Sequence, residues 1–439
     1  MRPPLSWADL PGRRVGVLGL GLEGQANVRA CRARGIEPVL VDDHPRAEGV
    51  LATGDGGLDA LLACDVVVKT PGVSHYGPVV TAIEAAGVPV VGGLGLWLAG
   101  VDRSRVACIT GTKGKSTTTA IAGHLLNRLG HRALAGGNLG VPPFDPLVGD
   151  DDYDYWVIEV SSYQAVDVPV SPAVVAVTSL SPDHLPWHRD DAETYYRDKL
   201  SLAAQPGADL TVANGDSTLI RERRALLGPR VQWVHESDEP TATWMEPLRL
   251  LGGHNRRNAL IAEAVLVALG VQEATDADAL RSAAADFGGL ESRLQVIGEV
   301  DGVMFVDDSL STNVLPALAA VDAFPQRRVA LIVGGQDRGI DYRALGEGLR
   351  SRTEQLLLLG IPENGGRILD AVVAAGPGTA VEPRTQPDLT TAVRTAFDWA
   401  RPGGVVLLSP AAPSFGIFRD YRQRGEVFAA AMQACMAPA

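Results

Sequence analysis

The sequence predicts an α/β protein built from three successive domains. Short apolar runs alternate with helix-like stretches along the whole chain, as expected for strand–helix–strand units. Glycine-rich or polar loops directly follow several of these runs, and open α/β sheets bind ligands at such strand ends. The chain has 439 residues and 46% hydrophobic content. This length suits about two to four domains, each with its own core.

The composition favours small molecules as partners. A formal net charge of −13 argues against nonspecific binding to nucleic acid or anionic membranes. The N-terminal segment lacks the apolar region of a signal peptide and no apolar run approaches a membrane span, so we expect a cytoplasmic protein. The cysteines, without CxxC spacing, indicate neither a disulfide framework nor a zinc site; the first three are expected to be small buried hydrophobes. They are Cys31, Cys64, Cys108 and Cys435.

The first domain, residues 1–100, is expected to begin with a strand–helix–strand unit. A buried-strand pattern at 14–18 leads into a GxGxxG turn at 19–24, a helix-like stretch to Arg34, and a second strand at 39–41 that ends in Asp42. This pattern suits NAD, UDP or another nucleotide diphosphate, and equally a tight strand–helix junction without a ligand. The turn alone therefore leaves the ligand open.

Two further apolar runs predict the remaining strands of this first domain. They are expected at 66–69 and 88–91, and the loop 69–72 follows the first of them. A ligand of the domain is expected at this loop, because it lies at the carboxyl end of a strand.

The second domain, residues 101–289, carries a phosphate-binding pattern. A strand at 105–110 is followed by GTKGKSTTT at 111–119 and an apolar-periodic helix. Glycines 111 and 114 let backbone N–H groups face phosphate oxygens, Lys115 adds a positive charge, and the hydroxyl of Ser116 or Thr117 can reach Mg²⁺. The loop is one residue shorter than GxxxxGK[ST], and a glycine turn without a ligand is the alternative. We expect ATP to bind here.

Two polar residues follow later strands of this domain, at 155–160 and 174–179. Glu159 ends the apolar run WVIEV, where a carboxylate that supports Mg²⁺ would lie; the alternative is a cap for the next helix. His184 lies in the turn SPDHL, and its position alone favours a solvated loop histidine.

The third domain, residues 290–439, repeats the alternation. Strands are expected at 303–306, 329–333, 355–359 and 405–408, with helices at 314–323 and 389–399 between them. The loops DDSLSTN, GGQDRGIDY and SPAAPSFG follow strands and are candidate ligand sites.

The motifs in this order resemble those of the Mur ligases, specifically the glutamate-adding members, over essentially the whole chain. They are GTKGKST at 111–117, GNLG at 137–140, IEVSSYQ at 158–164, SPDHLPWH at 181–188, YYRDKLSL at 195–202, GGHNRRNA at 252–259, SRLQV at 292–296, DDSLSTN at 307–313, GGQDRG at 334–339 and LLSPAAPSFG at 407–416. The resemblance implies a Rossmann-like N-terminal domain that binds the UDP-substrate, a central P-loop ATPase-like domain, and a Rossmann-like C-terminal domain for glutamate and nucleotide.

The resemblance also implies an ATP-dependent acid–amino-acid ligase of peptidoglycan precursor synthesis, and so of cell-wall biogenesis, cell shape and cell division. Such ligases convert the carboxylate of a UDP-N-acetylmuramoyl substrate into an acyl phosphate, which the amine of the incoming amino acid attacks. Phosphoryl transfer between anions needs charge neutralisation, which Lys115 and Mg²⁺ would provide.

The site residues that the resemblance implies fall into four groups. Those with catalytic roles are Lys115, His184 and Lys199. The Mg²⁺ ligands are Ser116 with Glu159 in one site and His184 with a carbamylated Lys199 in a second. Those for the nucleotide are Gly111, Thr112, Lys113, Gly114, Lys115, Ser116, Thr117, Asn255, Asn258, Arg293 and Asp308. Those for substrates are Gly21, Leu22, Asp42, Thr70, Gly72, Asn138 and Ser161 on the UDP-sugar side, and Thr312, Arg338, Ser414, Phe415 and Tyr421 for the amino acid. By spacing alone, Lys199 would be an ordinary lysine on a helix surface.

The chain departs from the common pattern of D-glutamate-adding members at two places. Ser292 stands where a histidine is usual, and Leu310 replaces a lysine in the loop at 308–313. With the other motifs, these departures favour a variant that adds L-glutamate to UDP-N-acetylmuramoyl-L-alanine and leaves inversion of the product to a separate epimerase.

Several alternatives remain at this stage. They are D-glutamate as the acceptor, a folylpolyglutamate-type ligase, a dehydrogenase built on the GxGxxG turn, and a nonenzymatic nucleotide-binding protein. The dehydrogenase would leave Lys115, His184 and Lys199 without a role. Because family members close their third domain over the ligands, we also expect a hinge near residues 288–291, where two glycines allow backbone rotation.

Overall fold

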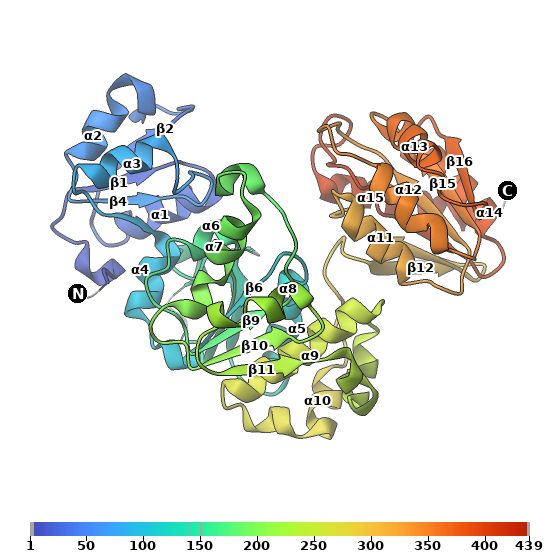
Figure 1. Cartoon of the computed structure of the whole chain (residues 1–439), viewed down its shortest axis with the longest axis horizontal. Helices are drawn as coiled ribbons and strands as arrows, with labels where there is room; N and C mark the ends of the chain where they lie inside the picture. The colour runs from blue at the N-terminus through green and yellow to red at the C-terminus, as the bar shows by residue number, and fades with distance from the viewer. Residues whose placement is uncertain (1–3, 139, 150–151, 437–439) are drawn as a thin grey trace. The chain divides into compact units, whose positions relative to one another are not determined.

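A computed structural model describes residues 4–138, 140–149 and 152–436. The chain forms two compact units, and each is described by itself (Figure 1). The first unit comprises Met1–Arg249 and His254–Phe287, and the second comprises Leu250–Gly253 and Gly288–Ala439. The second change of unit, between Phe287 and Gly288, falls at the start of the segment for which a hinge is predicted. The hinge and the limits of the three predicted domains stay predictions.

The first sheet has five parallel strands in the order β3-β2-β1-β4-β5. Its strands β1 and β4 are buried along their whole length. The strands are β1 (Val15–Leu18), β2 (Val39–Asp42), β3 (Val50–Ala52), β4 (Val66–Lys69) and β5 (Val90–Gly92), and the helices are α1 (Leu22–Arg32), α2 (Leu58–Leu62), α3 (Pro78–Ala85) and α4 (Gly93–Gly100).

The second sheet has six parallel strands in the order β11-β10-β9-β6-β8-β7. The strands are β6 (Val106–Thr110), β7 (Ala133–Gly137), β8 (Tyr155–Glu159), β9 (Val174–Val177), β10 (Leu210–Asn214) and β11 (Val231–Val234). The helices are α5 (Lys115–Arg128), α6 (Ser162–Ala165), α7 (Ala192–Ala204), α8 (Thr218–Glu222), α9 (Gly253–Ala268) and α10 (Ala277–Ala283).

The first two sheets share one continuous core. Val17 and Val68 of the first sheet belong to the same buried cluster as Cys108 and Val175 of the second, and Leu96 of α4 lies in it too. Burial of this apolar surface, which stabilises by roughly 25 cal/mol per Å², joins the two sheets into one unit.

The third sheet forms the second unit and has the order β12-β13-β17-β14-β15-β16. Strand β12 is antiparallel to β13, and the other neighbours are parallel. The strands are β12 (Gln295–Val300), β13 (Val303–Asp307), β14 (Val329–Val333), β15 (Leu356–Gly360), β16 (Val381–Thr385) and β17 (Val405–Leu408). The helices are α11 (Val314–Asp322), α12 (Arg343–Gly348), α13 (Gly365–Ala374), α14 (Leu389–Ala400) and α15 (Tyr421–Cys435).

Alternate residues of these strands face two separate cores. Leu331 and Leu407 pack with α11, α12 and α13, whereas Ile332 and Leu408 pack with α14 and α15. Because side chains alternate across a strand, strands covered on both faces must be apolar at nearly every position.

The predicted fold class is confirmed. Strands β4, β14 and β17 have the predicted limits, and the other predicted strands begin and end within two residues of theirs. The strands that were not predicted are β3, β7, β10, β11, β12 and β16. Cys31, Cys64 and Cys108 are buried, as expected for small hydrophobes. Across the described ranges, no helix is long and apolar enough to cross a membrane.

Substitution of a glycine in the turn after β1 would test how tightly this turn packs against the loop after β4. Gly19 has φ of 85°, and a Cβ atom there would lie 2.3 Å from Cγ2 of Thr70. Gly35 has φ of 72° with open space around it. We expect Gly35→Ala to cost about 1–2 kcal/mol of strain, and Gly19→Ala about 1–3 kcal/mol more from overpacking. Urea unfolding of the full chain measures both, and equal destabilisation by the two variants would contradict the packing argument.

Candidate active site

The loop between β6 and α5 has the backbone shape that the phosphate-binding pattern requires. Gly111 and Gly114 have φ of 137° and 91°. A Cβ atom at Gly111 would lie 2.2 Å from Oγ1 of Thr178, and one at Gly114 would lie 2.5 Å from Oδ1 of Asn258. Both positions therefore need glycine, for conformation and for space.

Residues after β9 hold this loop in place. The N–H groups of Thr112 and Lys113 donate to the carbonyl and the hydroxyl of Ser179, both at 2.8 Å. These two N–H groups are therefore engaged inside the protein instead of facing an anion. The first N–H groups of α5, at Lys115, Ser116 and Thr117, follow the loop directly, and the first N–H groups of a helix are the ones that can donate to an anion. The start of α5 is therefore a better candidate for an anion site than the glycines themselves.

Lys199 of α7 lies buried against the same loop. Its side chain is nearly inaccessible, at 2% exposure. Its Nζ donates to the carbonyl of Gly111 at 3.0 Å and lies 5.0 Å from the ring centre of Tyr195. Burial and the nearby charge of Lys115 hold the pKa of Lys199 well below its ordinary value. The alternative of an ordinary surface lysine is therefore wrong.

Glu159 is a buried carboxylate at the end of β8. It is 2% exposed, and its Oε1 accepts from Nδ2 of Asn138 at 3.0 Å. Its Oε2 is buried and has no hydrogen-bond partner among the described residues. The next helix, α6, is capped by the hydroxyl of Ser161, which accepts from the N–H of Gln164. The alternative role of Glu159 as a helix cap is therefore wrong, and its orphaned oxygen suits a cation.

His184 lies in the turn after β9 and is the most exposed of the predicted catalytic residues. Its side chain is 60% exposed, with φ of 52°, and its Nε2 lies 3.7 Å from Oδ1 of Asp183. Partial burial and the charges of Lys113, Lys199 and Lys115 lower its pKa, against the effect of Asp183. Among the described residues, no three His, Cys, Asp or Glu side chains converge into a metal-binding group.

A buried polar network, not predicted from the sequence, supports α7. His188 shares hydrogen bonds with Oδ2 of Asp198 at 2.6 Å and with the hydroxyl of Ser162 at 3.1 Å. The hydroxyl of Tyr76 donates to the other oxygen of Asp198 at 2.6 Å. Because Asp198 immediately precedes Lys199, this network positions the turn of α7 that carries the buried amine.

The start of α9 lies against the phosphate loop. Asn258 is the neighbour that a side chain at Gly114 would meet, and its Nδ2 donates to Oδ1 of Asn255 at 3.2 Å. The structure therefore brings these two predicted nucleotide residues to the loop. Arg293 and Asp308 belong to the second unit. There, burial raises the pKa of Asp308 to about 6, although Ser409 donates to it at 2.7 Å.

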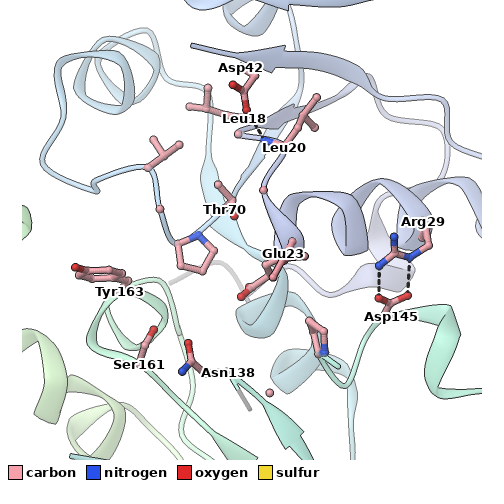
Figure 2. A pocket seen from close by; sticks show the side chains of 18 of the residues that line it. Leu18, Leu20, Glu23, Arg29, Asp42, Thr70, Asn138, Asp145, Ser161 and Tyr163 are labelled. Carbon is pink, nitrogen blue, oxygen red and sulfur yellow. Dashed lines mark hydrogen bonds and ion pairs between the residues drawn. The ribbon is translucent and has the colours of Figure 1, made fainter. Parts of the chain in front are cut away.

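A cavity of about 720 Å³ lies in the first unit (Figure 2). Its lining includes every residue predicted on the UDP-sugar side: Gly21, Leu22, Asp42, Thr70, Gly72, Asn138 and Ser161. They come from the end of β2, from loops after other strands of the first two sheets, and from the starts of α1 and α6. Leu139 of the GNLG motif lies outside the described residues.

The cavity also contains residues that were not predicted. Arg29 of α1 donates to both carboxylate oxygens of Asp145, at 2.9 and 2.5 Å. Arg29 follows Leu22 by two helical turns, so a helix-face argument applied to α1 would have found it. Glu23 and Tyr163 line the cavity as well (Figure 2).

The predicted amino-acid site lies on three loops of the second unit. Ser414 is buried and Phe415 is half exposed, with the guanidinium of Arg338 5.9 Å from its ring centre. Thr312 is exposed, and Tyr421 begins α15. Arg338 and Phe415 are thus brought together.

A buried arginine of α15 fixes these loops. Arg424 has no exposed surface, and it donates to the carbonyls of Ser309 at 2.6 Å, Ala412 at 3.2 Å and Gly334 at 3.4 Å. Burial lowers its pKa to about 10. Each of the three loops predicted to hold the amino acid therefore receives a hydrogen bond from one guanidinium.

The sequence matches two domain families, and the fold is similar to solved structures of the same kind. Residues 109–246 match the Mur ligase middle domain, and residues 292–412 match the Mur ligase, glutamate ligase domain. The fold is similar to that of UDP-N-acetylmuramate-alanine ligase MurC from Thermotoga maritima, with a TM-score of 0.56 and 17% identity over 96% of this chain and 99% of that one. It is also similar to that of MurF ligase from Thermotoga maritima in complex with ADP, with a TM-score of 0.57 and 14% identity over 98% and 97%.

Relatives that match over nearly their whole length identify a branch of the family to which the chain is similar. One from Micromonospora sp. is 42% identical over 97% of this chain and 98% of its own length. One from Xanthomonas axonopodis pv. citri is 37% identical over 96% and 95%. Both are named UDP-N-acetylmuramoyl-L-alanine--L-glutamate ligase. The chain belongs to the Mur ligase family, which are ATP-using ligases, and the family predicted from the motifs is confirmed.

The clash at Gly114 gives a test of the phosphate loop. Gly114→Ala would push into Asn258 at the nucleotide side of the loop, so we expect affinity for a nonhydrolysable ATP analogue to fall at least about tenfold, equivalent to about 1.4 kcal/mol. Gly130→Ala is a matched control, because Gly130 has φ of 94° and ends the same helix in open space. Calorimetric titration measures both variants, and an equal loss in both would show that backbone strain alone matters.

Proposed function

We propose that this protein joins L-glutamate to UDP-N-acetylmuramoyl-L-alanine at the expense of ATP, through an acyl phosphate. The match over nearly the whole length to relatives of that name carries the proposal. The cavity supports it, because all seven residues predicted on the UDP-sugar side line one space of about 720 Å³.

The ATP half of the reaction is assigned to the loop after β6. The N–H groups at the start of α5 and the ammonium of Lys115 would stabilise the phosphate oxygens as negative charge moves between them. Asn255 and Asn258 would bind the nucleotide beside this loop. Arg293 and Asp308 are proposed as further nucleotide residues.

The residues at this sheet edge fit Mg²⁺. The buried, unpartnered Oε2 of Glu159 is a ready ligand, and the hydroxyl of Ser116 belongs to the first turn of α5. His184 is proposed as a ligand of a second ion with Lys199. Bound Mg²⁺ would neutralise charge on the phosphates.

Lys199 has the properties that carbamylation needs. Burial and the charge of Lys115 lower the pKa of this amine and so favour its neutral form, whose lone pair can attack the carbon of CO₂ while the nitrogen releases a proton. The product is an anionic carbamate in place of a cation that would repel Mg²⁺.

The amino-acid site is proposed on the loops that Arg424 fixes. Arg338 would pair with the side-chain carboxylate of glutamate, with Thr312, Ser414, Phe415 and Tyr421 around it. The two departures from the D-glutamate pattern are neighbours in the fold, because the N–H of Leu310 donates to the carbonyl of Ser292 at 3.0 Å. Because two contacting residues both differ from the D-glutamate pattern, these departures support a different amino acid as the acceptor.

We further propose that the protein is cytoplasmic and that a separate epimerase inverts the product.

The acceptor is tested by phosphate release with ATP, Mg²⁺ and UDP-N-acetylmuramoyl-L-alanine. We expect L-glutamate to be preferred over D-glutamate at least about tenfold in kcat/KM, equivalent to about 1.4 kcal/mol. Mass measurement confirms the amide product, and Lys115→Ala should release phosphate at least about 100-fold more slowly. A preference for D-glutamate would replace the L-glutamate assignment, and no release with either would remove the proposed acceptor class.

Carbamylation is tested without turnover. Protein equilibrated with ¹³C-bicarbonate should show a carbamate resonance in its carbon NMR spectrum, because the lowered pKa of the buried Lys199 favours the neutral amine that reacts with CO₂. Lys199→Met should lack the resonance, whereas Lys113→Met, which removes a half-exposed lysine nearby, should retain it. A resonance that persists in Lys199→Met would refute the assignment.

A further inference from the structure

The cavity of the first unit carries an unfavourable charge for an anionic ligand. Its lining includes four carboxylates and the guanidinium of Arg29. The carboxylates are Glu23, Asp42, Asp43 and Asp145. The ligand expected from the proposed function, on which this inference rests, carries a diphosphate and a carboxylate of its own. Like charges in such a space repel strongly unless they are paired or neutralised.

Three of the four carboxylates have an ion pair, backbone hydrogen bonds or solvent to stabilise their charge. Asp145 is paired with Arg29. Asp42 accepts from the N–H groups of Leu20 at 2.7 Å and His44 at 2.9 Å, and Asp43 is exposed to solvent. Glu23 differs, because it projects from the start of α1 toward the side of the cavity that Ser161 and Asn138 line (Figure 2).

The hydrogen bond to Glu23 comes from an uncharged donor with a fixed orientation. Nε2 of Gln164 donates to Oε2 of Glu23 at 2.7 Å. Gln164 is buried, and its own oxygen accepts from the N–H of Ser161 at 2.9 Å. The amide of Gln164 is therefore held with its N–H₂ end toward Glu23, whether Glu23 is charged or neutral.

The two charged groups that act on Glu23 shift its pKa in opposite directions. Lys69 lowers its pKa and Asp167 raises it, but these two side chains form a buried ion pair with each other, and His75 faces the same Asp167. Burial outweighs the hydrogen bond and raises the pKa of Glu23 to about 7. The N–H groups at the start of α1 would stabilise a carboxylate, but a bound phosphate would compete for the same groups.

We propose that Glu23 binds the UDP-substrate as a neutral carboxylic acid that donates its O–H to an anionic oxygen of the substrate. One proton passes from solvent to the Glu23 carboxylate when the substrate binds at a pH where free Glu23 is ionised. The O–H then replaces a charge repulsion by a hydrogen bond, with the Gln164 amide still donating to the other oxygen.

The test is calorimetric binding of UDP-N-acetylmuramoyl-L-alanine at pH 6 to 9, without ATP, in buffers of different ionisation enthalpy. Above pH 7 the wild-type protein should take up about one proton per substrate and lose affinity about tenfold per pH unit. Glu23→Gln keeps the shape and a donor, so it should bind with an affinity that does not change over this range and without this proton uptake. Glu84→Gln, on the exposed face of α3, should behave like wild type.

The outcomes separate this inference from the proposed function. Wild-type binding without proton uptake, or the same uptake by Glu23→Gln, would overturn the role of Glu23 alone. No binding of the nucleotide substrate at any pH would overturn the proposed function and this inference together. UDP-N-acetylglucosamine, which lacks the carboxylate arm, identifies the anionic oxygen. Uptake with both ligands supports a bond to the diphosphate, and uptake with the muramoyl ligand alone supports a bond to the carboxylate.

Discussion

The hydrogen bond from the buried amine of Lys199 to the carbonyl of Gly111 ties α7 to the phosphate loop, and contacts on both sides hold its two partners in place. An amine so far from water is tolerated when it is neutral or modified and when its neighbours are fixed. The network of Asp198, His188 and Ser162 fixes α7 against α6, and the residues after β9 fix the loop. The chemistry expected of Lys199 therefore depends on packing well outside the glycine-rich motif.

The core shared by the first two sheets explains why the cavity and the phosphate loop belong to one unit. The first and second sheets share a core, so the loops after their strands keep a constant spacing around the cavity. The carboxylates of the cavity are largely held by local partners, which leaves little freedom to respond to a ligand except through protonation. In the second unit a single guanidinium, that of Arg424, has the corresponding role for three loops.

The features that could be predicted from the sequence are those formed by residues close together in the chain, such as buried strands and the phosphate loop. Strands such as β6 and β14 are buried on both faces and show as apolar runs, whereas the edge strand β16 is VEPRT and mostly exposed, so it has no such signal. The phosphate loop is local and was found. Glu23 and Gln164 lie 141 positions apart, and Tyr76 and Asp198 lie 122 apart. Such pairs become visible only when the fold brings them together. The motif resemblance, not spacing, identified Lys199, and only the structure shows that it is buried.

The position of β17 has a consequence for biosynthesis. This strand, Val405–Leu408, is the last strand of the third sheet in the chain, yet it lies in the middle, between β13 and β14. The second sheet is complete at Val234, so its loops can take shape while the ribosome is still translating the rest. Until residues 405–408 emerge, β13 and β14 are nascent apolar segments without their common partner, and they need protection from aggregation. A stalled or truncated product would therefore hold an ordered loop between β6 and α5 but an incomplete third sheet, and it would be a ready target for quality-control proteases.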